Sequence, residues 1–166
     1  IARVTFIVKK RSTTPSIGEP APRSSNKTAA DISTLGEITS DVHPDPALYQ
    51  MTIAEALETG RPLLVTFATP GFCTSATCGP QVEVVKALRE TYSGRINFIH
   101  VEVYENPNEM IGNINEAKLS PEIEEWGLPT EPWTFIIDGA GYVVDKFEAF
   151  VSYEEIDEAL PKLLQN

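Results

Sequence analysis

The sequence predicts an α/β domain in which helices flank a mixed central sheet, and three observations predict it. Two apolar runs of strand length, at 63–68 and 96–103, are separated by a stretch of helical periodicity. Two further runs, at 133–138 and 142–150, are joined by a glycine-rich turn at 139–141, which favours an antiparallel hairpin. A chain of 166 residues, 42% hydrophobic, is long enough for one such core without a disulfide or a metal.

Capping signals and apolar periodicity locate the helices. Capping-box patterns at 52–55 and 152–155 predict two helix starts, and Gly60 ends the first of these helices. Apolar residues on one face predict a longer helix over 80–92, and a short helix is expected at 121–126. Because helices separate most of the strands, we expect parallel strand pairs with right-handed crossovers before the closing hairpin.

The first 46 residues differ from the rest of the chain. Residues 1–10 alternate apolar and polar side chains and are expected to form a strand, either the last strand of an upstream domain or an edge strand of this one. Residues 11–46 hold five of the thirteen prolines and many polar residues, which predicts a linker and an irregular arm. Residues 47–166 are then the main domain.

The charge distribution excludes one class of partner. The net charge is -11, and residues 31–166 alone carry seven basic and twenty-three acidic side chains. Such a body is repelled by phosphate backbones, so we expect no nucleic acid partner. The short basic stretch at 9–11 is interpreted as the solvated edge of a linker.

The two cysteines mark the candidate site. Cys73 and Cys78 lie where the first buried strand meets the long helix, and the free amides and dipole of a helix start favour a thiolate. A disulfide between them closes a six-residue loop, which the chain-entropy model credits with roughly 2 kcal/mol. Three interpretations stay open: a redox-active pair, a structural disulfide, and two independent thiols.

The residues around the cysteines resemble those of a known family. TGRPLLVTFATPGFC (59–73) resembles the strand that leads to the active cysteine of the thioredoxin superfamily, and WGLPTEPWTFIIDGAG (126–141) resembles its proline-containing later segment. IGEPAP (17–22) is similar to the opening of exported redoxin modules. The resemblance covers 17–166 and implies a thioredoxin-like fold with an irregular N-terminal extension. It also implies thiol-disulfide exchange with protein thiols or disulfides, without a cofactor.

The resemblance implies roles for single residues. Cys73 takes the place of the nucleophile and Cys78 that of the resolving cysteine. Pro132 matches the family's cis-proline, and the backbone of Glu131 before it is expected to pair with an extended substrate segment. The residues expected to contact that segment are Phe72, Glu131, Pro132 and Trp133.

The sequence departs from the family pattern in two ways that bear on chemistry. The cysteine spacing is C-x4-C rather than C-x2-C, and Thr66 stands where thioredoxins carry a buried acid. The family's geometry and reduction potential therefore do not carry over. The alternative function is a non-catalytic thioredoxin-like module that binds a protein partner and holds a structural disulfide.

Two other chemistries of this fold are disfavoured. A copper site of the Sco type needs a C-x3-C pair and a downstream histidine, whereas His43 lies far upstream and His100 lies in a predicted buried strand. We therefore expect no metal. Peroxiredoxin chemistry needs Thr or Ser three residues before the reactive cysteine; Ser75 fits this before Cys78, but Trp133 replaces the expected arginine.

The start of the sequence suggests where the protein works. It begins with Ile1 and shows no basic-then-apolar leader. Together with the lone strand, the linker and the redoxin-like opening, this predicts a protein that acts outside the cytoplasm. We expect it to be fused or tethered to a membrane through its N-terminus.

Overall fold

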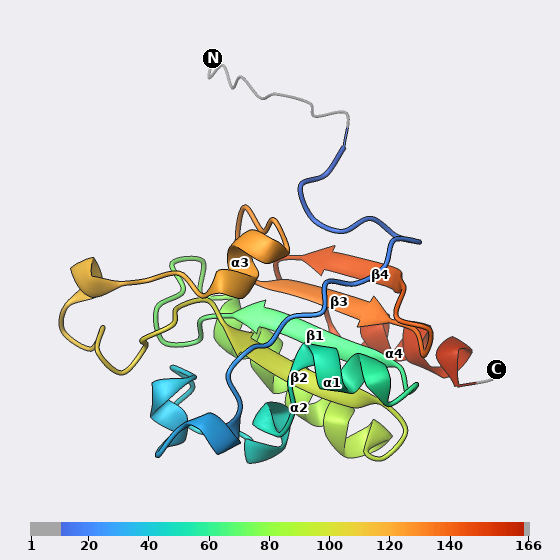
Figure 1. Cartoon of the computed structure of the whole chain (residues 1–166), viewed down its shortest axis with the longest axis horizontal. Helices are drawn as coiled ribbons and strands as arrows, with labels where there is room; N and C mark the ends of the chain where they lie inside the picture. Colours follow the sequence, from blue (N-terminus) through green and yellow to red (C-terminus); the bar gives the residue numbers. More distant parts are fainter. Residues whose placement is uncertain (1–10, 165–166) are drawn as a thin grey trace.

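The structure is a computed structural model that describes residues 11–164. Helices cover both faces of one four-stranded sheet, and the N-terminal segment crosses one of these faces (Figure 1). The fold class predicted from the sequence, a mixed sheet flanked by helices, is confirmed. The strand expected at 1–10 lies outside the described residues.

The sheet has the order β2-β1-β3-β4, with β1 at its centre beside β2 and β3. β1 runs parallel to β2 and antiparallel to β3, and β3 pairs antiparallel with β4. The strands are β1 (Leu63–Ala68), β2 (Asn97–Glu102), β3 (Trp133–Ile137) and β4 (Val143–Glu148). Every residue of β1, β2 and β3 is buried, which explains why β1 and β3 appear in the sequence as nearly continuous apolar runs, whereas β2 also buries Asn97, His100 and Glu102.

Two helices cover each face of the sheet. The four helices are α1 (Ile53–Glu58), α2 (Cys78–Tyr92), α3 (Pro121–Glu125) and α4 (Tyr153–Leu163). α2 and α4 pack on one face, and α1 and α3 line the other, where Trp126 lies against Phe67 and Phe135. Both predicted capping boxes are formed, at Thr52 and at Ser152.

The direction of β3 differs from the expected parallel pairing. Trp133 at the start of β3 pairs with Phe67 near the end of β1, so β3 begins at the edge of the sheet where β2 ends. The connection over 103–132 extends beyond that edge instead of crossing the sheet (Figure 1). Its helix α3 has five residues and spans about 8 Å, which is too short to traverse a strand of about 20 Å.

Residues 11–46, here called the arm, pack against the domain along much of their length. The backbone N–H groups of Gly18 and Ala21 donate to the carbonyls of Val143 and Gly141 at and just before the start of β4, at 2.8 and 2.9 Å. Ala21 and Ile38 are buried, one in each of the two cores. Three 3-10 helices follow one another towards the domain: η1 (Ala29–Asp31), η2 (Leu35–Glu37) and η3 (Pro46–Tyr49). The arm therefore contributes side chains to both cores.

A search for helices that could cross a bilayer, made over residues 11–164, finds none with the required length and apolar character.

The arm's contribution to stability is testable at one hydrogen-bonded serine. The indole N–H of Trp126 donates to Ser24 Oγ at 2.8 Å, and the Ser24 hydroxyl donates to the Glu125 carboxylate. Replacing Ser24 by alanine leaves a buried indole N–H without a partner, so we expect the free energy of unfolding to fall by roughly 1–3 kcal/mol. Urea denaturation measures this change.

The neighbouring Ser25 provides a matched control because its side chain is exposed and makes no hydrogen bond within the described residues. Ser25→Ala should change the free energy of unfolding by less than about 0.5 kcal/mol. Equal stabilities for Ser24→Ala and Ser25→Ala would contradict a structural role for the arm.

Candidate active site

The two cysteines lie at opposite ends of one short loop, between the end of β1 and the start of α2. The chain leaves β1 through a turn in which the N–H of Phe72 donates to the carbonyl of Thr69 at 3.2 Å. Cys73 follows this turn, and Cys78 is the first residue of α2, two residues earlier than the predicted helix start. Both cysteines are free thiols.

The helix start faces the loop with unsatisfied donors. Thr77 is the N-cap residue of α2, but its side chain makes no capping hydrogen bond. Its hydroxyl instead bonds to the Ser75 hydroxyl at 2.7 Å. The first amides of the 15-residue helix are therefore left to interact with groups in the loop, and the helix dipole favours a negative charge there.

Cys73 occupies this position and is partly exposed. Its Sγ lies 3.1 Å from Ser75 Oγ, at the end of the hydroxyl chain from Thr77. Partial burial raises the pKa of Cys73. Hydrogen bonds from the Cys78 thiol, the Ser75 hydroxyl and the backbone N–H groups of Cys78 and Thr77 outweigh this effect and lower the pKa to about 7. About half of Cys73 is then thiolate at neutral pH.

Cys78 has the opposite environment. Its side chain is fully buried in the core between α2 and the sheet. Burial raises the pKa of Cys78, the Cys73 thiol and the charge of Glu131 add to this effect, and the Thr69 N–H opposes it. The site therefore pairs an accessible thiolate with a buried, protonated thiol.

The predicted partner-contact residues lie around the same edge of the sheet. Phe72 is partly exposed and packs edge-on against Tyr104, with the ring centroids 6.2 Å apart. Glu131 is partly exposed, its pKa is raised by burial, and the peptide bond between it and the buried Pro132 is cis.

The side chain of Trp133, in contrast, lies mainly inside the fold. It is 7% exposed, stacks on Phe135 with centroids 5.7 Å apart, and donates its indole N–H to Thr130 at 3.0 Å. Its contact with a partner stays a prediction.

Two threonine hydroxyls pair at the strand position where thioredoxins carry a buried acid. Thr66 is fully buried, and its Oγ1 lies 3.0 Å from that of Thr134 on the neighbouring strand. One hydroxyl donates to the other, so this buried strand position holds a hydrogen-bonded hydroxyl pair in place of a carboxyl group. Four other buried side-chain atoms make no hydrogen bond within residues 11–164; two of them belong to ion pairs, and the other two are the hydroxyl of Thr69 and the side-chain nitrogen of Gln81.

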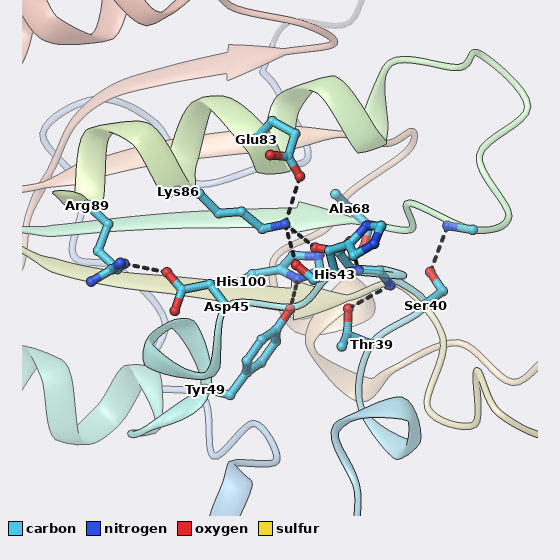
Figure 2. A network of polar contacts seen from close by, with 12 residues as sticks. Thr39, Ser40, His43, Asp45, Tyr49, Ala68, Glu83, Lys86, Arg89 and His100 are labelled. Carbon is cyan, nitrogen blue, oxygen red and sulfur yellow. Dashed lines mark hydrogen bonds and ion pairs between the residues drawn. The ribbon is translucent and has the colours of Figure 1, made fainter.

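Both histidines make structural contacts. His100 is buried between Tyr49 and the end of β1 (Figure 2). Its Nε2 donates to the Ala68 carbonyl at 3.0 Å, so the neutral ring accepts from the Tyr49 hydroxyl at Nδ1, at 2.7 Å. Burial lowers the pKa of His100. His43 offers its backbone carbonyl to Lys86 at 2.8 Å.

A search of residues 11–164 finds no group of three His, Cys, Asp or Glu side chains that could hold a metal ion.

The sequence points to both cysteines as candidate site residues, but it gives little sign of the groups that surround them. In the sequence, Ser75 stands out only through a peroxidase-like spacing and Thr77 carries no signal, although both are hydroxyl residues inside the C-x4-C loop. Tyr104 and Ser40 gave no sequence signal because they reach the site from distant segments of the chain.

Comparisons with known proteins give matches among solved structures. No family model and no curated protein matches the chain. A candidate thiol:disulfide interchange protein DsbE from Chlorobium tepidum matches with a TM-score of 0.61 and 13% identity, covering 91% of this chain and 99% of its own. MTB dsbF, solved in mixed oxidised and reduced forms, matches with a TM-score of 0.53 and 20% identity, over 68% of this chain and 87% of its own.

A third match is a thiol:disulfide interchange protein of the thioredoxin family from Chlorobium tepidum TLS. It has a TM-score of 0.53 and 19% identity, over 75% of this chain and 99% of its own. At these identities the matches establish the fold, and they confirm the thioredoxin-like fold that the sequence resemblance implied.

The lowered pKa of Cys73 predicts how its reactivity depends on pH. Because the thiolate is the nucleophile, the rate of alkylation by iodoacetamide should rise with a midpoint near pH 7, which is the pKa of the folded protein. In the denatured chain the midpoint should lie near the ordinary value of about 8.5. Mass spectrometry of the peptide that contains Cys73 measures the rate.

Two variants of Cys78 serve as a matched pair. Cys78→Ala removes one of the groups that lower the Cys73 pKa, so the midpoint should move upward, whereas Cys78→Ser keeps a donor and should move it less. If the midpoint of the folded wild type equals that of the denatured chain, this description of the site is wrong.

Proposed function

We propose that the protein exchanges thiols and disulfides with protein partners through Cys73 and Cys78. The observation that carries the proposal is the contrast between the two thiols at the start of α2. Cys73 is accessible and its pKa is about 7, whereas Cys78 is buried and its pKa is raised. An accessible thiolate beside a buried thiol is the arrangement that a nucleophile and a resolving cysteine need. The fold shared with thiol:disulfide interchange proteins supports the proposal.

The exchange proceeds in two displacements. The Cys73 thiolate attacks one sulfur of the partner's disulfide, a mixed disulfide forms, and the other partner sulfur leaves as a thiolate. Cys78 then loses its proton and attacks the Cys73 sulfur, which releases the second partner thiolate. The partner gains two electrons and two protons and becomes a dithiol, while Cys73 and Cys78 become a disulfide. The same steps in reverse oxidise a partner dithiol.

The low pKa of Cys73 matters for both directions of the reaction. A thiol of lower pKa is a better leaving group, so when a partner dithiol is oxidised the mixed disulfide opens readily: the partner's second thiolate attacks the partner's first sulfur, and Cys73 leaves as a thiolate. Burial and the neighbouring Cys73 raise the pKa of Cys78 and keep its thiol protonated, and the part due to the Cys73 charge is lost once the mixed disulfide has formed.

The surface beside Cys73 provides the contact for a partner segment. In the proposal, the exposed part of the Phe72 ring contacts the partner's side chains, and the backbone of Glu131 before Pro132 pairs with its extended chain. Phe72 is supported from behind by Tyr104, and Trp133 supports the start of β3 from inside the core.

We also propose that this exchange takes place outside the cytoplasm, where protein disulfides persist. The exported-redoxin pattern in the sequence supports this location, and the tether through the N-terminus stays a prediction. Fractionation of cells that express the complete gene checks both.

A trapping assay tests the exchange. The reduced wild type should accelerate the reduction of insulin disulfides by dithiothreitol, and Cys73→Ser should lower the rate to that of dithiothreitol alone. Cys78→Ser should accumulate a mixed disulfide through Cys73, because nothing resolves it. Non-reducing electrophoresis and mass spectrometry identify that species.

Thr74→Ala is the matched control for this assay, since Thr74 is an exposed loop residue whose side chain makes no hydrogen bond within the described residues. It should react like the wild type. If the wild type leaves insulin reduction unchanged, and its cysteine pair is reduced only when the protein unfolds, the pair is a structural disulfide and the non-catalytic binding module is the correct function.

A further inference from the structure

The arm reaches the turn that precedes Cys73, and one serine makes the contact. The N–H of Gly71 donates to Ser40 Oγ at 2.9 Å. Because Oγ accepts this bond, the Ser40 hydroxyl is free to donate, and it does so to Glu102 Oε2 at 2.6 Å. Gly71 and Ser40 are 31 residues apart, and Glu102 ends β2, so three separate segments meet here.

The carboxylate of Glu102 is held by donors on two sides. It is 4% exposed, and its Oε2 accepts from the Ser40 N–H at 2.8 Å as well as from the hydroxyl. Its Oε1 accepts from the N–H of Val103 at 3.0 Å. A buried carboxylate needs such donors, so Ser40 is fixed in place by the charge that it satisfies.

Close packing at Gly71 shows how tightly the turn lies on the arm. A Cβ added at Gly71 would lie 2.9 Å from Ser40 Cβ and 3.0 Å from its carbonyl oxygen. These distances leave no room for a side chain, so the backbone of the turn rests directly on Ser40.

The next residue of the arm, Asp41, contacts α2, the helix that begins with Cys78. Asp41 forms an ion pair with Lys86 of α2 at 2.6 Å, and both side chains are largely buried. The N–H of Asp41 donates to Thr39 Oγ1 at 3.1 Å, which orders this bend of the arm. Two consecutive residues thus join the turn that carries Cys73 to the helix that begins with Cys78.

A second contact fixes the end of β1 to the same part of the chain. His100 bonds to the carbonyl of Ala68, the last residue of β1, and to the hydroxyl of Tyr49 in η3. The short path from β1 to Cys73 is therefore attached to residues 40–49 at two points: at Ala68 through His100, and at Gly71 through Ser40.

We propose that Ser40 and Glu102 are positioning residues, which hold the turn at Gly71 so that the Cys73 sulfur stays over the start of α2 and beside Cys78. The inference rests on the proposed exchange function, because it assigns these residues to the same site. Without the Ser40 hydroxyl, the turn loses its attachment, and Cys73 moves away from the donors at the start of α2.

The test compares Ser40→Ala with wild type in the full chain. At pH 7, alkylation of Cys73 should slow by about fivefold, which is the change in thiolate fraction when the midpoint rises by about one pH unit. In glutathione buffers, the equilibrium constant for closing the Cys73–Cys78 disulfide should fall. Glu102→Gln keeps an acceptor for the Ser40 hydroxyl and should give a smaller effect on both quantities.

Ser33→Ala is the matched control, because Ser33 is an exposed arm residue whose hydroxyl makes no hydrogen bond within residues 11–164. It should behave like the wild type in both measurements. A folded Ser40→Ala protein with the wild-type alkylation profile and the wild-type disulfide equilibrium would overturn the proposal.

A measurement on the unmodified protein covers the case in which Ser40→Ala does not fold. The Gly71 amide should be protected from hydrogen exchange in the wild type, and exchange at the rate of a free loop amide would overturn the proposal. The insulin assay separates the two proposals. If the wild type fails to exchange disulfides, the proposed function fails, while the difference in Cys73 alkylation between wild type and Ser40→Ala still decides the positioning role.

Discussion

The site depends on stabilising a negative charge on Cys73 with neutral groups. The protein carries a net charge of -11, and the groups that lower the Cys73 pKa are a thiol, a hydroxyl and the first amides of α2. Such donors act only within hydrogen-bond distance, unlike a positive charge, whose effect reaches further. The reactivity of Cys73 is therefore a question of position, and the fold must hold the end of β1 and the start of α2 in a fixed relation.

Strand pairing, helix packing and the arm together fix the end of β1 relative to the start of α2. β1 is paired on both sides, and α2 packs on it through Val82, Val85 and Leu88, which are almost fully buried. These contacts fix the strand and the helix but leave the loop between them attached only at its ends. The arm supplies the remaining restraint at Ser40 and Asp41, which makes a segment of irregular structure part of the site.

The sequence predicted the elements that repeat a pattern, and it failed where contacts join distant residues. Buried strands, amphipathic α2 and the capping boxes each leave a local signal, and the family resemblance singles out Cys73, Cys78 and Pro132 as candidates. The arm has no such period, because short 3-10 turns and single side chains hold it, as between Ser24 and Trp126, 102 residues apart. The direction of β3 also had no local signal, since it follows from where the connection 103–132 lies.

The reduction potential of the Cys73–Cys78 pair tests the central claim most directly. Equilibration of the folded protein with graded thiol-disulfide buffers, followed by trapping of the free thiols, gives this potential. Stabilising the Cys73 thiolate favours the reduced form, so the account predicts a potential above about -300 mV, with the protein folded in both redox states. A potential below about -300 mV, or reduction that occurs only together with unfolding, would contradict it.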